Sequence, residues 1–241
     1  GFGQNDTTNV FRLVHAEGDG LPGLIVDFYN GTAVMQMHSV GMYLIQEELV
    51  EALKEVLGDR LKAVYDKSAR TLPDKAAIDP KDGYLFGKKS ENEVLEYGLK
   101  FNIDWEAGQK TAFFIDQREN RLLVQQYAEN RDVLNMFGYT GGFSIYALKG
   151  GAKTVHSVDA SARAIDLTNE NVALNFPNEP RHEAFTADAF EYLKDIPNKY
   201  DLIILDPPAF AKHRSSLHQA LQGYKRINTR AFEQIRSGGI L

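Results

Sequence analysis

The chain has 241 residues, 25% of them charged and 43% hydrophobic, which is ordinary for a folded globular protein. A net charge of −6 argues against a protein that is basic all over and binds any nucleic acid, although it allows a local basic patch. The absence of cysteine excludes disulfides and thiolate metal sites within this chain, and its six histidines are scattered, so we expect no metal. No apolar run reaches the roughly 18 residues that span a bilayer and no signal peptide is visible, so we expect a cytoplasmic protein without a membrane partner.

The first part of the chain predicts a small α+β domain at residues 1–104. Strand-like runs alternate with turns, and Asn30-Gly31 is a strong signal for a two-residue hairpin. Apolar residues at helical spacing predict one helix, with Gly58 just past its end. The expected elements are strands at 11–15, 24–29, 33–37 and 63–65, a helix at 45–57, a loop at 70–93 with room for a short hairpin, and a β-hairpin at 94–103.

Residues 105–241 predict an α/β domain with a Rossmann-like sheet. A helix with a capping-box-like start, Asp116 and Glu119, precedes a short apolar strand at 133–136. A glycine-rich turn and a helix follow this strand, as they do where a doubly wound sheet opens a nucleotide pocket at the carboxyl ends of its strands. Gly138 and Gly141 permit close approach of a ligand, and the next helix points its amino terminus at it.

Acidic residues follow the next two strand-like runs. Asp159 ends the run 154–158, where an acid accepts hydrogen bonds from the ribose hydroxyls of an adenosine-containing cofactor. Ser161 then predicts the start of a helix. Asp188 follows a strand at 184–186, and it can accept from an adenine amino group, cap the next helix, or do both.

A fourth run, 200–205, ends in Asp206-Pro207-Pro208-Ala209-Phe210. This rigid corner suits an enzyme that modifies a flat base. It does not suit a nicotinamide dehydrogenase, whose glycines would also be spaced G-x-G-x-x-G. A helical apolar stripe follows, in which only Tyr224 is a candidate for substrate contact. Basic residues also gather here, forming either an RNA-facing surface or a solvated helix face. They are Lys212, His213, Arg214, Lys225, Arg226 and Arg230.

Together these motifs resemble the bacterial cytosine-C5 methyltransferases of the 23S ribosomal RNA, which use S-adenosylmethionine. The motifs run nearly end to end in one order, which makes the resemblance specific. They are the runs 12–27, 108–111, 114–118, Asn135 with 139–143, 206–210 and 223–225.

The resemblance implies a class I methyltransferase with a PUA-type RNA-binding domain, a small central α+β domain and a Rossmann-like catalytic domain. The chain corresponds to the last two, so we interpret it as a fragment without the PUA domain and the final strands of the sheet. The implied cofactor is S-adenosylmethionine and the implied partner is large-subunit ribosomal RNA. The oligomeric state stays open, with a homodimer among the options.

The resemblance and the fold pattern together assign three sets of site residues. In the catalytic set, Asp206 holds the base edge, the two prolines fix its direction, and Phe210 offers a stacking face; the set is Asp206, Pro207, Pro208 and Phe210. The cofactor set is Phe114, Gln117, Arg118, Gly138, Tyr139, Thr140, Gly141, Asp159, Ala160, Ser161, Asp188 and Ala189. The RNA set is Lys212, Arg214, Tyr224 and Lys225.

Methylation of cytosine at C5 requires a nucleophile that adds to C6, a role that suits a cysteine thiolate. The chain has none, so the nucleophile lies beyond Leu241 or is absent, and the chain as it stands should bind cofactor without methylating C5. The runner-up is a methyltransferase acting on a base nitrogen, where the Asp-Pro-Pro-x-Phe corner cradles an amino group and no cysteine is needed. A third interpretation is a non-catalytic RNA-binding or assembly factor with this fold, which the intact corner disfavours.

Overall fold

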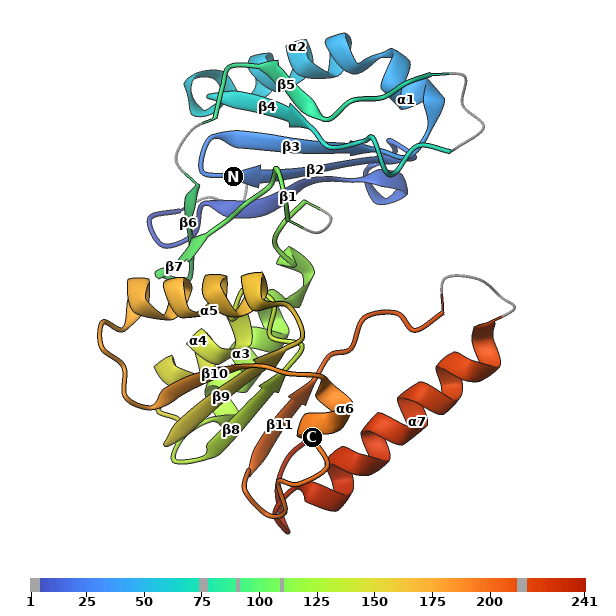
Figure 1. Ribbon diagram of the computed structural model, residues 1–241. Helices are drawn as coiled ribbons and strands as arrows, with labels where there is room; N and C mark the ends of the chain where they lie inside the picture. Colours follow the sequence, from blue (N-terminus) through green and yellow to red (C-terminus); the bar gives the residue numbers. More distant parts are fainter. Residues whose placement is uncertain (1–4, 74–77, 90–91, 109–110, 212–215) are drawn as a thin grey trace. The chain divides into compact units, whose positions relative to one another are not determined.

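The computed structural model describes residues 5–73, 78–89, 92–108, 111–211 and 216–241 (Figure 1). The chain forms two compact units, Gly1–Asp116 and Gln117–Leu241. The segment after residue 104 belongs to the first unit, whereas the sequence placed the boundary there. The reason is aromatic packing: Trp105 stacks on Tyr29, with ring centroids 6.2 Å apart, and Phe113 packs on Phe101 at 5.1 Å.

The first unit contains a five-stranded sheet in the order β1-β2-β3-β4-β5. Antiparallel pairing joins β1 to β2 and β2 to β3, and β4 is parallel to β3 because helix α2 crosses over between them. A separate hairpin, β6–β7, follows. The elements are β1 Val10–His15, η1 Ala16–Asp19, β2 Leu24–Tyr29, β3 Thr32–Met37, α1 Val40–Leu44, α2 Gln46–Leu57, η2 Gly58–Arg60, β4 Ala63–Asp66, β5 Gly83–Phe86, β6 Glu93–Glu96 and β7 Leu99–Asn102.

Most of these elements agree with the sequence pattern. Asn30 and Gly31 adopt positive φ angles of 44° and 103°, as the predicted hairpin turn requires. Helix α2 covers the sheet through Val50, Leu53 and Leu57, which lie in one buried cluster with strand residues. The predicted loop at 70–93 contains strand β5, and this strand pairs antiparallel with β4.

A buried carboxylate, that of Asp27, joins two of the sequence motifs of the first unit. Asp27, at the end of the run 12–27, is fully buried and accepts from the Arg12 guanidinium at 2.8 and 3.1 Å. It also accepts from the hydroxyl of Thr111 at 2.5 Å. Asp27 therefore anchors the segment around residue 111 to the sheet, which is a structural role for Thr111 in the motif at 108–111. Gln109 and Lys110 of this motif lie outside the described residues.

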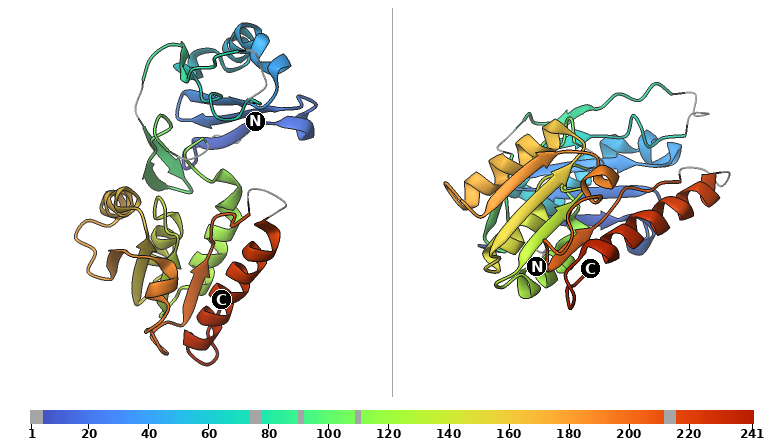
Figure 2. Two further views of the ribbon diagram at one scale, coloured as in Figure 1. Left: turned by 45° about the vertical axis from the view of Figure 1, so that its right-hand side comes forward. Right: turned by 60° about the horizontal axis from the view of Figure 1, so that its bottom comes forward.

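The second unit is a parallel sheet in the order β10-β9-β8-β11. Helices α3, α4 and α5 lie on one face, and α6 and α7 on the other (Figures 1 and 2). Ile240 adds a further parallel bridge to Leu202. The elements are η3 Ile115–Gln117, α3 Arg118–Tyr127, β8 Asp132–Met136, α4 Gly142–Lys149, β9 Thr154–Asp159, α5 Ala162–Asn175, β10 His182–Thr186, α6 Ala189–Tyr192, β11 Leu202–Leu205 and α7 Leu217–Gln234.

This order confirms the predicted Rossmann-like sheet and locates its ligand side. The chain moves from β8 outward through β9 to β10 and then returns to β11 on the other side of β8. Ligands of such sheets bind at this switch point, beyond the carboxyl ends of the strands. The predicted capping box before α3 is wrong. Asp116 lies in the 3-10 turn, and Gln117 is the N-cap residue of α3. Within the described part of the chain, the Gln117 side chain makes no capping hydrogen bond.

Candidate cofactor and substrate site

The turn between β8 and α4 is tightly curled. Phe137, Tyr139 and Gly141 all have positive φ angles, of 58°, 47° and 75°. The Gly141 N–H donates to the Gly138 carbonyl at 2.8 Å, and the Gly138 N–H donates to the Val158 carbonyl at 3.1 Å. Bulky residues rarely adopt such angles outside sites where the surroundings enforce them. The turn is therefore shaped by its neighbours, as expected of a ligand-binding loop.

Helix α5 supports this turn from one side. The Thr168 hydroxyl donates to the Tyr139 carbonyl and the Asn171 amide donates to the Thr140 carbonyl, both at 3.0 Å. A Cβ atom on Gly141 would come within 2.8 Å of the Thr168 methyl group, so only glycine fits there. The carbonyls of the turn are thus held by α5.

Asp159 connects the end of β9 to the same turn. One carboxylate oxygen accepts from the Tyr139 N–H at 3.1 Å, and the other accepts from the Ser161 N–H at 2.9 Å. A carboxylate has about four lone-pair directions, so each oxygen can accept one more hydrogen bond. The geometry of Asp159 therefore fits the pair of ribose hydroxyls for which the sequence selected it.

The predicted adenine side lies at the start of α6. Asp188 is exposed and its side chain caps α6 by accepting from the Glu191 N–H at 3.0 Å, while Ala189 is buried beneath it. Ser161 caps α5 in the same way through the Ala164 N–H at 3.3 Å, and Ala160 beside it is exposed. Both caps confirm the predicted helix starts. The adenine contact of Asp188 stays a prediction.

A buried polar chain runs beneath the glycine turn, and sequence reasoning missed it. The Asn135 amide donates to the Ser144 hydroxyl at 2.9 Å, Ser144 lies 2.7 Å from the Ser157 hydroxyl, and Ser157 lies 2.9 Å from Nε2 of His182. Burial, and then the charge of nearby His156, lower the pKa of His182 to about 4, so the imidazole is neutral near pH 7. Only Asn135 carried a signal, through its place in the motif.

The Asp206–Phe210 corner is supported by helix α7. The Phe210 N–H donates to the Tyr224 hydroxyl at 3.3 Å. The same hydroxyl can donate to the Pro208 carbonyl at 3.5 Å. The rings of Phe210 and Tyr224 pack with centroids 4.5 Å apart. Asp206 and Pro208 are exposed, and Pro207 and Phe210 are half-buried. Tyr224 therefore fixes the backbone of the corner, while a direct RNA contact for it stays a prediction.

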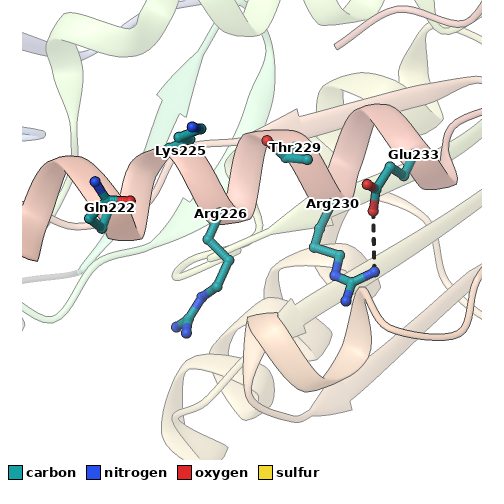
Figure 3. Close-up of a pocket in the computed structure, with 6 residues that line it drawn as sticks. All are labelled: Gln222, Lys225, Arg226, Thr229, Arg230 and Glu233. Carbon is teal, nitrogen blue, oxygen red and sulfur yellow. Dashed lines mark hydrogen bonds and ion pairs between the residues drawn. The ribbon is translucent and has the colours of Figure 1, made fainter.

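Beside the corner, α7 presents a basic face (Figure 3). It borders a shallow depression of about 340 Å³. The Arg226 guanidinium lies over the ring of Phe190, 4.2 Å from its centroid, and Arg230 pairs with Glu233 at 3.2 Å. The depression is lined by Gln222, Lys225, Arg226, Thr229, Arg230 and Glu233. The predicted RNA residues Lys212 and Arg214 lie outside the described residues.

Three predicted cofactor residues lie around the boundary between the units. Phe114 is half-buried and belongs to the first unit, whose core contains its neighbour Phe113. Gln117 and Arg118 open α3 in the second unit, where Gln117 accepts from the Asn120 amide at 2.6 Å. Their closure over the cofactor stays a prediction.

With this geometry in place, comparison with known proteins defines the class. Residues 15–241 match the model of the S-adenosylmethionine-dependent methyltransferase family, and the chain belongs to that family. The predicted fold class and the predicted cofactor are thereby confirmed. Within the described residues, no group of three His, Asp or Glu is arranged to hold a metal ion, and no helix is long and apolar enough to cross a membrane.

Among curated relatives, the chain is similar to proteins named ribosomal RNA large subunit methyltransferase I. The one from Alteromonas mediterranea is 40% identical over 97% of this chain and 59% of the relative, and the one from Vibrio vulnificus is 39% identical over 99% and 61%. The one from Escherichia coli strain SMS-3-5 is 37% identical, again over 99% and 61%. The chain thus spans about three fifths of the length of these relatives.

Solved structures agree with the family. SMU.776, described as a methyltransferase complexed with SAH, superposes with a TM-score of 0.83 at 27% identity over 98% of this chain and 61% of that one. A tRNA m1G37 methyltransferase from M. jannaschii gives 0.64 at 21% identity over 89% and 57%, which shows a shared fold.

Proposed function

We propose that the protein transfers a methyl group from S-adenosylmethionine to a base of large-subunit ribosomal RNA, and therefore acts in the cytoplasm. One observation carries the proposal: β8 and β11 are neighbours in register, with Met136 opposite Leu205. The glycine turn follows Met136 and the Asp206 corner follows Leu205, so the two emerge side by side. A cofactor-binding turn and a base-holding corner meet at the switch point of the sheet.

The residues of the second unit fit the cofactor. Asp159 retains acceptor capacity for two hydroxyls, the glycine turn offers backbone without bulky side chains at Gly138 and Gly141, and Asp188 stands at the next strand end. When bound, S-adenosylmethionine supplies an electrophilic methyl group on a sulfonium. The chain's part is to hold that methyl group facing the corner and to exclude water from it.

The corner would receive a base unstacked from the RNA. Asp206 is exposed and can accept from a base amino group, while the two prolines restrict the backbone that carries it. Phe210 offers a ring for stacking, and Tyr224 holds the corner in place. This set positions a flat ring and gives it one polar anchor.

The name shared by the curated relatives supports ribosomal RNA as the substrate, and the sequence resemblance supports C5 of cytosine as the target atom. The lack of cysteine in this chain favours a second candidate, methylation of a base nitrogen, because C5 chemistry needs a nucleophile at C6. In that case Asp206 would hold the amino group that receives the methyl group.

One experiment separates these candidates. The intact protein is incubated with isotope-labelled S-adenosylmethionine and unmodified ribosomal RNA, and the labelled nucleoside is identified by mass spectrometry after digestion. Labelled 5-methylcytidine supports the C5 assignment, and label on a nitrogen supports the second candidate. Unlabelled RNA, from protein that binds the cofactor, contradicts the proposed activity and leaves a non-catalytic RNA-binding role.

A further inference from the structure

Helix α7 has two chemically distinct faces. Ala220, Ile227 and Ala231 are buried, and Ile227 lies in one core cluster with residues of the sheet. The opposite face carries the six residues that line the depression in Figure 3, spaced three or four apart so that they align along the helix. Three of them are cationic and two are neutral hydrogen-bonding residues. We call this set, Gln222, Lys225, Arg226, Thr229, Arg230 and Glu233, the α7 basic face.

The charge of this face contrasts with the rest of the chain. The protein carries a net charge of −6, yet the sequence of α7 contains a single acid, Glu233, at the far end. Helix α2, which also borders a surface depression, is the reverse: its exposed residues there include Glu47, Glu48 and Glu51. A basic surface is therefore not a general property of the exposed helices of this protein. The α7 basic face is a local positively charged surface that is complementary to anionic groups.

The α7 basic face is connected to the corner by aromatic packing. The Arg226 guanidinium lies 4.2 Å from the centroid of Phe190, and the Phe190 ring packs on Phe210 at 6.2 Å. Tyr224, two residues before Arg226, supports the corner from the same helix. Stacking on Phe190 restricts the rotamers of Arg226, so less entropy is lost when it binds a phosphate.

We propose that the α7 basic face binds the phosphate backbone of the RNA strand that flanks the unstacked base, with Arg226 as the central contact. This inference rests on the proposed RNA methyltransferase function. When a base is rotated out of its stack, the phosphates on either side remain within one nucleotide of it, so cations beside the corner are where those phosphates arrive. Phosphate contacts of this kind position RNA without reading its sequence.

The test measures binding of unmodified, transcribed ribosomal RNA to the intact protein at several salt concentrations. Arg226→Gln should weaken binding by about five- to tenfold at moderate salt and lower the slope of log affinity against log salt by about 0.7, the value for one phosphate contact on a single strand. Lys225→Gln with Arg230→Gln should lower the slope further, whereas Arg226→Lys, which keeps the charge, should preserve it. Affinity for S-adenosylmethionine should not change, which also shows that the variants fold.

Lys153→Gln is the matched control, because it removes the same charge from an exposed residue at the amino-terminal edge of the sheet, before β9. Equal losses in Lys153→Gln and Arg226→Gln would mean that net charge alone matters and would overturn the docking surface. An unchanged affinity and slope in Arg226→Gln, with wild-type protein still methylating RNA, would overturn it while leaving the proposed function intact. Wild-type protein that neither binds nor methylates the RNA would overturn both.

Discussion

Asp159→Asn should weaken the binding of S-adenosylmethionine by between about tenfold and a hundredfold. In the structure, each carboxylate oxygen accepts one backbone N–H, from Tyr139 and from Ser161. Each oxygen can accept one further hydrogen bond, from a ribose hydroxyl, and asparagine keeps only one acceptor oxygen, so at least one charge-assisted hydrogen bond to the cofactor is lost. Such a bond contributes about 1.5–3 kcal/mol, and about 1.4 kcal/mol corresponds to a tenfold change in affinity. Loss of one of the two backbone hydrogen bonds would loosen the turn and add to this effect.

Isothermal titration calorimetry with S-adenosylmethionine measures the effect directly, and thermal unfolding without ligand checks that the variant is folded. Asp166→Asn is the matched control, since it makes the same substitution at an exposed position of α5 and should leave affinity unchanged. A folded Asp159→Asn protein whose affinity stays within about twofold of wild type would refute the assignment of the cofactor pocket to this turn, because the predicted loss starts at about tenfold.

Three further outcomes follow from the site. Gly141→Ala should lower the free energy of unfolding, measured in urea, by about 2–5 kcal/mol, because it places a side chain at a left-handed position and against Thr168. Gly138→Ala should cost clearly less, because its Cβ would meet its nearest neighbour at 3.4 Å. Equal losses in the two variants would contradict the clash at Gly141. Tyr224→Phe should reduce kcat/KM for RNA about two- to tenfold, because it removes the weak hydrogen bonds of the hydroxyl to the corner, which contribute about 0.5–1.5 kcal/mol. The Kd for the cofactor should stay unchanged, and a change in it instead would contradict the role of Tyr224 at the corner. Burial lowers the pKa of His182 in the folded protein to about 4, so the unfolded chain takes up a proton at a higher pH than the folded protein does. His182 therefore lowers the free energy of unfolding as pH falls from about 6.5 to 4. Urea unfolding of His182→Gln should show a smaller loss over that range, and an NMR midpoint near pH 6.5 would contradict the buried state.

The sheet of the second unit was predictable because its strands are short apolar runs ended by glycine or by an acid. The central strands of a parallel sheet are covered on both faces, so β8 and β11 are mostly apolar, and the pocket residues follow at the carboxyl ends of the strands. Asp159 and the glycine turn were identified in this way. Likewise, Asn30-Gly31 fixed the first hairpin, since few other pairs tolerate both positive φ angles.

Other features depend on register, which the sequence does not display. The hydrogen-bonded series Asn135–Ser144–Ser157–His182 connects β8, α4, β9 and β10. Nothing in the sequence around either serine indicates that its hydroxyl takes part. Strand β5 was missed because its charged, turn-rich surroundings hide a short half-buried run that is specified by pairing with β4. Tyr224 was selected for proximity to basic residues, whereas its contact with the corner depends on how α7 lies across the sheet.

The two halves of the proposed site are supported by different helices. Thr168 and Asn171 of α5 hold the glycine turn, and Tyr224 of α7 holds the corner, although the turn and the corner follow directly paired strands. Changes on α5 should therefore act on the cofactor and changes on α7 on the RNA. The two sides of the proposed site can therefore be altered separately, because the switch point places the turn and the corner on independent supports.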